Sequence, residues 1–142
     1  MFEPLTLMVV HAHPDDEAIG TGGMLAKYSA EGVRTVLVTC TLGEEGEIVV
    51  PELDTPENHA RLAEIRIEEL RAAVQQLGIS DLEIMPYRDS GMMGRPSNDH
   101  PECFWQADLH EATGRLVALV RRYRPQVLMS YNEEGGYGHP DH

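Results

Sequence analysis

The sequence predicts an α/β protein with a mostly parallel central sheet. Four short apolar runs, at residues 5–10, 35–39, 82–85 and 127–131, predict strands, and the continuous hydrophobicity of the first two is typical of strands that are buried. Helical patterns lie between several of these runs, as crossovers between parallel strands require. With 142 residues the chain has the length of one domain, and we expect a single domain over residues 1–142.

The first part of the chain alternates between strand and helix patterns. The run at 5–10 (LTLMVV) leads into a polar loop at 11–17 and then into a helix over 20–30. The second run, 35–39 (TVLVT), is followed by the glycine-rich and acidic segment 42–54, which has the composition of a long loop.

The helix after this loop has strong signals at both of its ends. Thr55 is a good N-cap, and Pro56 stands at the first helical position, where its missing N–H matters little. Gly78 follows the last apolar residue and supplies a left-handed stop. Between these ends, apolar residues recur at steps of three and four, as one buried helix face requires: Ala63, Ile67, Leu70, Val74 and Leu77.

The rest of the chain repeats the alternation. A strand at 82–85 precedes the segment 87–105, whose Gly, Pro, Asn and Asp residues lack a period and indicate an irregular loop. An amphipathic helix at 109–123 is followed by the fourth strand, 127–131, and by the polar segment 132–142. Ligands of such sheets bind beyond the carboxyl ends of the strands, where the strand order reverses. We therefore expect the loops after the first and fourth strands to face one another.

Composition excludes several classes of function. Lys and Arg number 11 against 24 Asp and Glu, and the resulting formal charge of −13 would repel nucleic acid and anionic membrane surfaces. The sequence has no long apolar run and no basic N-terminal segment, so we expect neither a membrane span nor a signal peptide. Cys40 and Cys103 lie too far apart in sequence to indicate a disulfide framework. We expect a cytoplasmic protein with a small-molecule partner, and the sequence leaves open whether it forms a homo-oligomer.

Two loops rich in histidine and carboxylate follow the first and fourth strands. Residues 11–17 read His-Ala-His-Pro-Asp-Asp-Glu, and residues 135–142 read Gly-Gly-Tyr-Gly-His-Pro-Asp-His. A catalytic zinc ion takes three nitrogen or oxygen ligands from the protein and leaves one position open for water. One histidine and one carboxylate from the first loop, with one histidine from the second, would supply this set. A second carboxylate beside them could accept the proton of the activated water.

Each motif also has another interpretation. Asp15, Asp16 or Glu17 could cap the helix that follows the first strand, because carboxylates stabilise helix N-termini. The glycine cluster at 20–23 could cradle a phosphate in a nucleotide-binding domain, but a lone cluster is weak evidence and the negative net charge opposes it. Two His- and Asp-rich loops after separate parallel strands favour a metal site over helix capping.

The two motifs, AHPDDE and GHPDH, resemble the signature motifs of the LmbE-like (PIG-L) zinc-dependent de-N-acetylases. Further similar segments lie at 43–47 (GEEGE), 61–69 (RLAEIRIEE), 89–92 (DSGM) and 131–142, so the resemblance covers essentially the whole chain. Within this family, the sequence most resembles the mycothiol S-conjugate amidases and the N-acetylglucosaminyl-inositol deacetylases. The resemblance implies a Rossmann-like three-layer sandwich.

The resemblance also implies a metal site and a catalytic pair. His13 and Asp16 of the first motif and His142 of the second match the family's ligands to Zn²⁺, and such a set also accepts Fe²⁺. Asp15 matches the general base that activates the metal-bound water. His139 matches a histidine that stabilises the oxyanion or protonates the leaving amine.

Other residues match supporting positions of the family. Tyr137 would help to polarise the amide carbonyl, and Asp141 would hold an imidazole in orientation. Three residues match positions that contact the sugar or its attached ring, and a fourth lies beside the last of them in a loop expected to line the pocket: Glu47, Arg66, Asp89 and Met92.

The resemblance implies hydrolysis of an amide, either by removal of an N-acetyl group from an amino sugar or by cleavage of a glucosaminyl-inositol thiol conjugate. Family members normally continue well beyond the second motif, whereas this sequence stops at His142. We therefore expect it to be the N-terminal portion of the usual family domain, truncated at the C-terminus. The alternative is a domain that binds a metal or a carbohydrate without catalysis.

Overall fold

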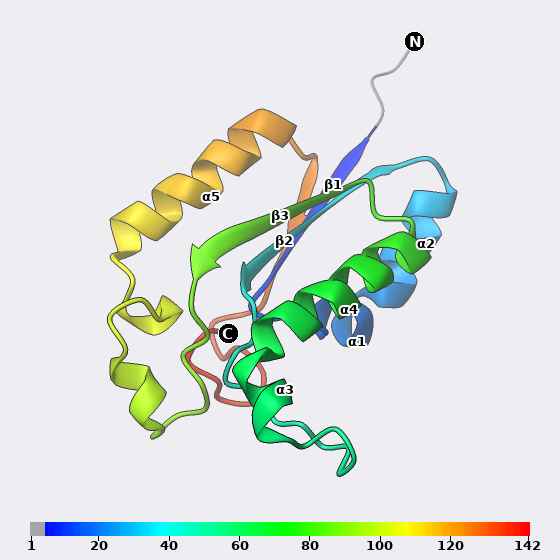
Figure 1. Cartoon of the computed structure of the whole chain (residues 1–142). Coiled ribbons are helices and arrows are strands. Elements are labelled where there is room, and N and C mark those ends of the chain that lie inside the picture. The colour runs from blue at the N-terminus through cyan, green and yellow to red at the C-terminus, as the bar shows by residue number, and fades with distance from the viewer. Residues whose placement is uncertain (1–4) are drawn as a thin grey trace.

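The computed structural model describes residues 5–142, and its strands form one sheet in which every pair is parallel (Figure 1). The order across the sheet is β3-β2-β1-β4. The strands are β1 (Thr6–His11), β2 (Arg34–Thr41), β3 (Asp81–Tyr87) and β4 (Val127–Met129). The parallel sheet predicted from the apolar runs is confirmed.

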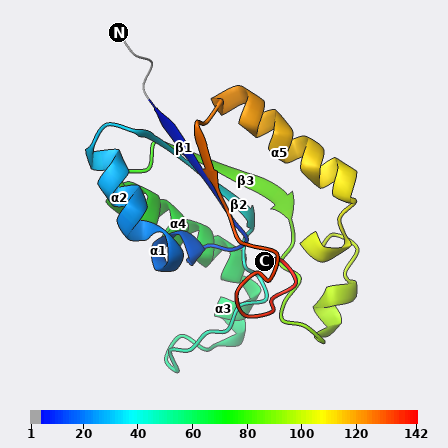
Figure 2. The same cartoon turned by 180° about the vertical axis from the view of Figure 1, so that it is seen from behind.

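Helices cover both faces of this sheet. Figures 1 and 2 show α1, α2 and α4 on one face and α5 on the other, so the predicted three-layer arrangement is confirmed. Two short 3₁₀ helices, η1 and η2, lie in the segment expected to be an irregular loop. The helices are α1 (Asp16–Gly20), α2 (Gly22–Ala30), α3 (Pro56–Ala60), α4 (Leu62–Leu77), η1 (Pro96–Asp99), η2 (Phe104–Gln106) and α5 (Leu109–Tyr123).

The alternating side chains of β1 explain why its apolar run is continuous. Successive side chains of a strand point to opposite faces of the sheet. Leu7 and Val9 pack in a core cluster with residues of α2 and α4, whereas Met8 and Val10 pack in a second cluster with residues of α5. A strand covered on both faces therefore needs an apolar residue at every position.

The fourth strand differs from its prediction. A strand was expected over 127–131, whereas β4 covers only Val127–Met129, and its three residues are 40–56% exposed. The reason is that β4 pairs with β1 alone among the described strands and forms an edge of the sheet. The strand ends at Met129, and beyond it Ser130 Oγ donates to the Val10 carbonyl of β1 at 3.1 Å.

Two predicted helices are interrupted. The helix expected over 20–30 begins earlier, at Asp16, and breaks at Thr21, whose φ of −131° is not helical. The helix capped by Thr55 breaks at Arg61 into α3 and α4. Its predicted ends are confirmed, since the Thr55 side chain accepts the N–H of Asn58 and Gly78 adopts a left-handed conformation with φ of 69°.

The strand order fixes where a ligand site can form. The chain moves from β1 through β2 to β3 on one side and then returns to place β4 on the other side of β1. The loops after β1 and β4 thus meet at the switch point, as expected from the sequence. Figure 2 shows the C-terminal segment (red) directly beyond the ends of β1 and β4. Among the described helices, none combines the length and the apolar character of a membrane span.

The two-sided core gives a stability prediction. Leu25 of α2 is fully buried, and Leu25→Ala is expected to lower the free energy of unfolding by about 2–5 kcal/mol, because a cavity replaces the lost side chain. Leu109, which is 77% exposed, provides the matched control, and Leu109→Ala should change the value by about 0.5 kcal/mol or less. Urea denaturation measures both. Equal effects of the two substitutions would contradict this description of the core.

Candidate metal centre

Three side chains from the two motif loops meet at the switch point. His13 Nδ1 lies 3.7 Å from Asp16 Oδ2 and 3.2 Å from His142 Nε2, and His142 Nε2 lies 3.6 Å from Asp16 Oδ2. A tetrahedral zinc ion with bonds of about 2.0–2.1 Å separates its ligand atoms by about 3.3 Å. The two imidazoles and one carboxylate thus have both the chemistry and the spacing of a metal-binding group.

Hydrogen bonds orient both imidazoles toward this point. His142 Nδ1 lies 3.1 Å from the Gly135 carbonyl, and His13 Nε2 lies 3.2 Å from Asp141 Oδ2 and 3.3 Å from Asp89 Oδ1. Carbonyl and carboxylate oxygens only accept, so these ring nitrogens are the donors. In the neutral imidazoles, His13 Nδ1 and His142 Nε2 then carry the free lone pairs. Metal-binding histidines are commonly held in this way.

Two buried carboxylates surround His13. Burial disfavours its charged ring, but the hydrogen bonds to Asp141 and Asp89 and the charges of Asp89 and Asp16 outweigh burial and raise the pKa of His13 to about 9. Burial likewise opposes ionisation of Asp89, yet the hydrogen bond and charge of His13 hold the pKa of Asp89 well below its usual range. Asp141 accepts the Ser90 N–H at 3.0 Å and the Ser90 hydroxyl. These contacts make the ring of His13 rigid.

Asp15, the expected general base, has a strained backbone. Its φ of 119° lies in a region that residues other than glycine rarely adopt. The carboxylate of Glu17, a residue that is 1% exposed, accepts the Asp15 N–H at 3.0 Å. Arg66 pairs with the Asp15 carboxylate at 3.0 Å. Burial raises the pKa of Asp15, and the charge of Arg66 opposes this shift. A raised pKa favours acceptance of a proton near neutral pH.

Arg66 holds the first motif loop in place. Its guanidinium donates to the carbonyl of Gly43 at 2.9 Å and to the carbonyl of Pro14, in addition to its pair with Asp15. The side chain is only 14% exposed. Arg66 was expected to contact the substrate; the structure places it at the cleft wall with most of its donors already bonded to the protein.

His139 lies beside His13, with a ring-centroid separation of 4.4 Å. Its Nδ1 accepts the Asp141 N–H at 3.2 Å, so the proton of the neutral ring is on Nε2. Burial, followed by the neighbouring charge of His13, lowers the pKa of His139. The neutral form is therefore favoured, with Nε2–H available as a hydrogen-bond donor.

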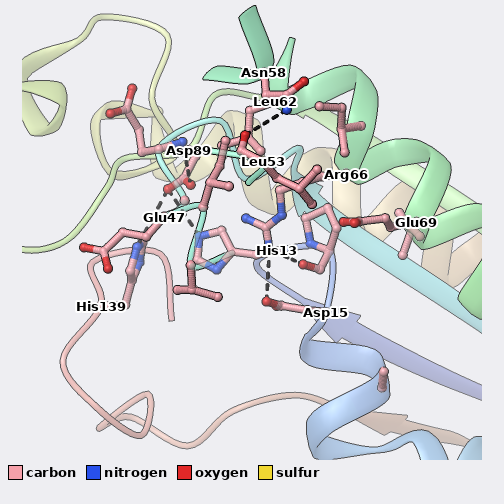
Figure 3. Close-up of a pocket in the computed structure, with 18 of the residues that line it drawn as sticks. His13, Asp15, Glu47, Leu53, Asn58, Leu62, Arg66, Glu69, Asp89 and His139 are labelled. Carbon is pink, nitrogen blue, oxygen red and sulfur yellow. Dashed lines mark hydrogen bonds and ion pairs between the residues drawn. The ribbon is translucent and has the colours of Figure 1, made fainter. Parts of the chain in front are cut away.

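A cleft of about 690 Å³ opens beside this cluster. Figure 3 shows His13, Asp89 and His139 on its polar side, and Leu53 and Leu62 on the side of α4. Eight of the residues singled out from the sequence line it: His13, Asp15, Glu47, Arg66, Asp89, Met92, Tyr137 and His139. The other three, Asp16, Asp141 and His142, lie behind this lining.

The outer residues of the cleft are more exposed. The Glu47 carboxylate pairs with Arg95 at 2.8 Å and is 74% exposed. Met92 is 38% exposed, and Tyr137, which also lines the cleft, is exposed and has its ring at 67° to that of His142 with a centroid distance of 4.9 Å. These side chains are placed to meet a ligand, whereas Asp89 is bonded to His13 and to the backbone.

Sequence reasoning missed three residues that build the site. Glu17 was considered only as a helix cap, and Ser90 and Tyr131 were noted only as parts of similar segments. Tyr131 contacts both Asp16 and His142. A signal was present, since Tyr131 lies two residues beyond β4, at the carboxyl end of the strand where ligand sites of parallel sheets form.

The fold and this cluster define an α/β protein with a His/Asp metal-binding group at the switch point of a parallel sheet. Residues 8–142 match the PIG-L family, described as GlcNAc-PI de-N-acetylase, and the chain belongs to this family.

Curated relatives support the same assignment. The 1D-myo-inositol 2-acetamido-2-deoxy-α-D-glucopyranoside deacetylase of Geodermatophilus obscurus is 56% identical over 142 residues, which cover 96% of this chain and 48% of the relative. A deacetylase of the same name from Catenulispora acidiphila is 57% identical, with 96% and 44% covered. The chain thus spans about half the length of the curated relatives it matches.

Solved structures share the fold. The N,N′-diacetylchitobiose deacetylase of Pyrococcus horikoshii aligns with a TM-score of 0.74 and 26% identity over 96% of this chain and 45% of that one. The 4-carboxy-2-hydroxymuconate hydratase of Pseudomonas putida aligns with a TM-score of 0.68 and 28% identity over 96% and 51%. The fold therefore occurs with more than one reaction, and the reaction must be argued from the site.

The contact between Arg66 and the loop gives a second prediction. A Cβ on Gly43, which has φ of +67°, would lie 2.0 Å from Arg66 Nη1. Gly43→Ala combines left-handed strain of about 1–2 kcal/mol with displacement of the guanidinium from its carbonyl partners. Gly32, with φ of +83° and nothing within 4 Å, is the matched control, because Gly32→Ala adds the strain without the clash. We expect a larger loss of unfolding free energy for Gly43→Ala. A loss no greater than that of Gly32→Ala would contradict the structural role of Arg66.

Proposed function

We propose that the protein is a metal-dependent deacetylase that removes the acetyl group from an N-acetylglucosaminyl-inositol. The observation that carries this proposal is the mutual spacing of 3.2–3.7 Å between one atom each of His13, Asp16 and His142. The names of the relatives that are 51–57% identical support the reaction and the substrate class. The cytoplasmic location expected from the sequence stays a prediction.

His13, Asp16 and His142 would hold the metal ion, which we propose to be Zn²⁺, with Fe²⁺ as the alternative that the same ligands accept. When bound, such an ion lowers the pKa of a coordinated water and polarises the amide carbonyl. Asp89 and Asp141 keep His13 in the tautomer that presents Nδ1 to the ion.

Asp15 would accept the proton of the attacking water. Its carboxylate lines the same cleft as His13, and Arg66 and Glu17 fix its strained position. Such a fixed base does not have to be oriented during the reaction. The proton taken by Asp15 is then available to the amine that leaves when the C–N bond breaks.

His139 would donate its Nε2–H to the oxyanion that develops on the amide carbonyl. The alternative role, protonation of the leaving amine, needs a charged ring, which its lowered pKa disfavours. A neutral donor fixed by the Asp141 N–H suits stabilisation of developing charge. The Tyr137 hydroxyl would assist in polarising the carbonyl.

The substrate's hydroxyls would meet the polar wall of the cleft. Glu47 is exposed and can exchange its pair with Arg95 for sugar hydroxyls, while Met92 offers an apolar surface to the sugar ring. Asp89 and Arg66 lie deeper and would contact the sugar only with the donors and acceptors left by their internal bonds.

The ligand assignment is tested by metal content. The protein prepared without chelator should hold about one equivalent of zinc or iron by elemental analysis, since the His/Asp groups of the described residues that could hold a metal all share His13. His13→Ala should lose the metal, and His59→Ala, which removes an exposed histidine paired with Asp54, should retain it. A His13→Ala variant with a full equivalent of metal would refute the assignment.

The base assignment is tested by turnover of N-acetylglucosaminyl-inositol, followed as released acetate. Asp15→Asn should lower kcat by about 10²–10⁴-fold while the metal stays bound, because the proton acceptor alone is removed. Asp54→Asn is the control, since the Asp54 side chain has nearly the same exposure and lies outside the cleft lining. Wild-type turnover by Asp15→Asn would exclude this base. Binding of the substrate without release of acetate by the unaltered protein would favour the non-catalytic alternative.

A further inference from the structure

We propose that Tyr131 is a positioning residue of the metal centre, which holds Asp16 through its hydroxyl group and His142 through its ring. The proposal rests on the proposed metal ligands, and it adds a residue that neither motif contains. Tyr131 belongs to the segment after β4, yet most of its polar contacts are with the segment after β1.

The hydroxyl group of Tyr131 has three partners. Its oxygen lies 2.7 Å from Asp16 Oδ2, 2.9 Å from the backbone nitrogen of Ala12 and 3.1 Å from His11 Nδ1. All three partners belong to the end of β1 or to the loop that follows it. The contact with Asp16 involves the same carboxylate oxygen that lies nearest to His13 and His142.

The number of hydrogens fixes the direction of these bonds. The Ala12 N–H can only donate to the tyrosine oxygen, and a carboxylate can only accept, so the single Tyr131 hydrogen goes to Asp16. His11 Nδ1 must then donate to Tyr131. A directed chain therefore runs from His11 through Tyr131 to Asp16, and every member of it except Asp16 lies outside the proposed ligand set.

The ring of Tyr131 contacts the second motif. It stacks on the imidazole of His142 at a centroid distance of 4.3 Å and an interplanar angle of 20°. His142 Nδ1 is fixed independently by the Gly135 carbonyl at 3.1 Å. The stack and this hydrogen bond together define the plane in which His142 presents Nε2. Tyr131 thus contacts one proposed ligand from each motif loop.

Two substitutions separate the contribution of the Tyr131 hydroxyl group to metal binding from that of its ring. Tyr131→Phe removes the hydrogen bond to Asp16 and keeps the ring on His142. Tyr131→Leu removes both. Loss of a hydrogen-bonding partner of a metal ligand typically weakens metal binding about 10–100-fold. We expect Tyr131→Phe to weaken Zn²⁺ binding by about this factor and Tyr131→Leu to weaken it further.

The experiment measures the Kd for Zn²⁺ by competition with a chromophoric chelator and the visible absorption spectrum of the Co²⁺-loaded protein. The spectrum reports the geometry of the ligands and does not depend on turnover. Tyr87→Phe is the matched control, because it removes a hydroxyl group that donates to Glu111, and neither of these residues lines the cleft. Tyr131→Phe should change both the affinity and the spectrum, and Tyr87→Phe should change neither.

Two outcomes distinguish this inference from the proposed function. If the unaltered protein binds no Zn²⁺, the metal centre itself is wrong and the inference falls with it. If it binds Zn²⁺ and Tyr131→Phe has the same affinity and Co²⁺ spectrum, only the role of Tyr131 is refuted. Should Tyr131→Phe fail to fold by near-ultraviolet circular dichroism, His11→Gln, which removes the Nδ1–H that donates to Tyr131, must weaken Zn²⁺ binding in the same direction. Unchanged binding by His11→Gln would then overturn the inference.

Discussion

The site depends on the two ring nitrogens of one buried histidine, His13. Its Nε2 is bonded to the carboxylates of Asp141 and Asp89, and its Nδ1 faces Asp16 and His142. A buried charged cluster is stable only when its members are closely paired, because each charge has lost its hydration. The loops after β1 and β4 must therefore stay in register to within the length of a hydrogen bond, and the parallel pairing of these two strands provides that register.

Several carboxylates lie close together in this region, and basic side chains at different places pair with them. Arg66 is the cation at the first motif, where it holds the carbonyl groups of Pro14 and Gly43 and the carboxylate of Asp15. Strained residues persist only where the surroundings over-determine them. Asp15 meets this condition, since Arg66 fixes its side chain and Glu17 fixes its N–H. As the proposed proton acceptor, Asp15 would enter the reaction already oriented.

The pattern of hydrophobic residues in the sequence predicted the sheet, the layers and the meeting of the two motif loops. This pattern does not predict features that depend on long-range side-chain contacts. The apolar residues of β4 resembled those of a central strand, because hydrophobicity does not report how many neighbours a strand has. The positive φ of Asp15 and the hydrogen bonds that Arg66 makes within the protein depend on partners up to 52 residues away in sequence. Family resemblance gave candidate ligands for the metal, but it could not give the hydrogen-bond directions that connect Tyr131 to Asp16.

One short turn in the second motif carries both a proposed metal ligand and the proposed donor to the oxyanion. The His142 N–H donates to the His139 carbonyl at 3.1 Å, and this turn brings the side chains of His139, Asp141 and His142 around His13. The Asp141 N–H orients His139 as a donor, while the Asp141 carboxylate orients His13. A hydratase shares the fold, so the sheet by itself leaves the reaction open. Amide hydrolysis needs a base for water and a donor for the oxyanion in one cleft. Asp15 and His139, the proposed base and donor, line the same cleft from opposite motif loops, so the proposed reaction would depend on the contact between those loops.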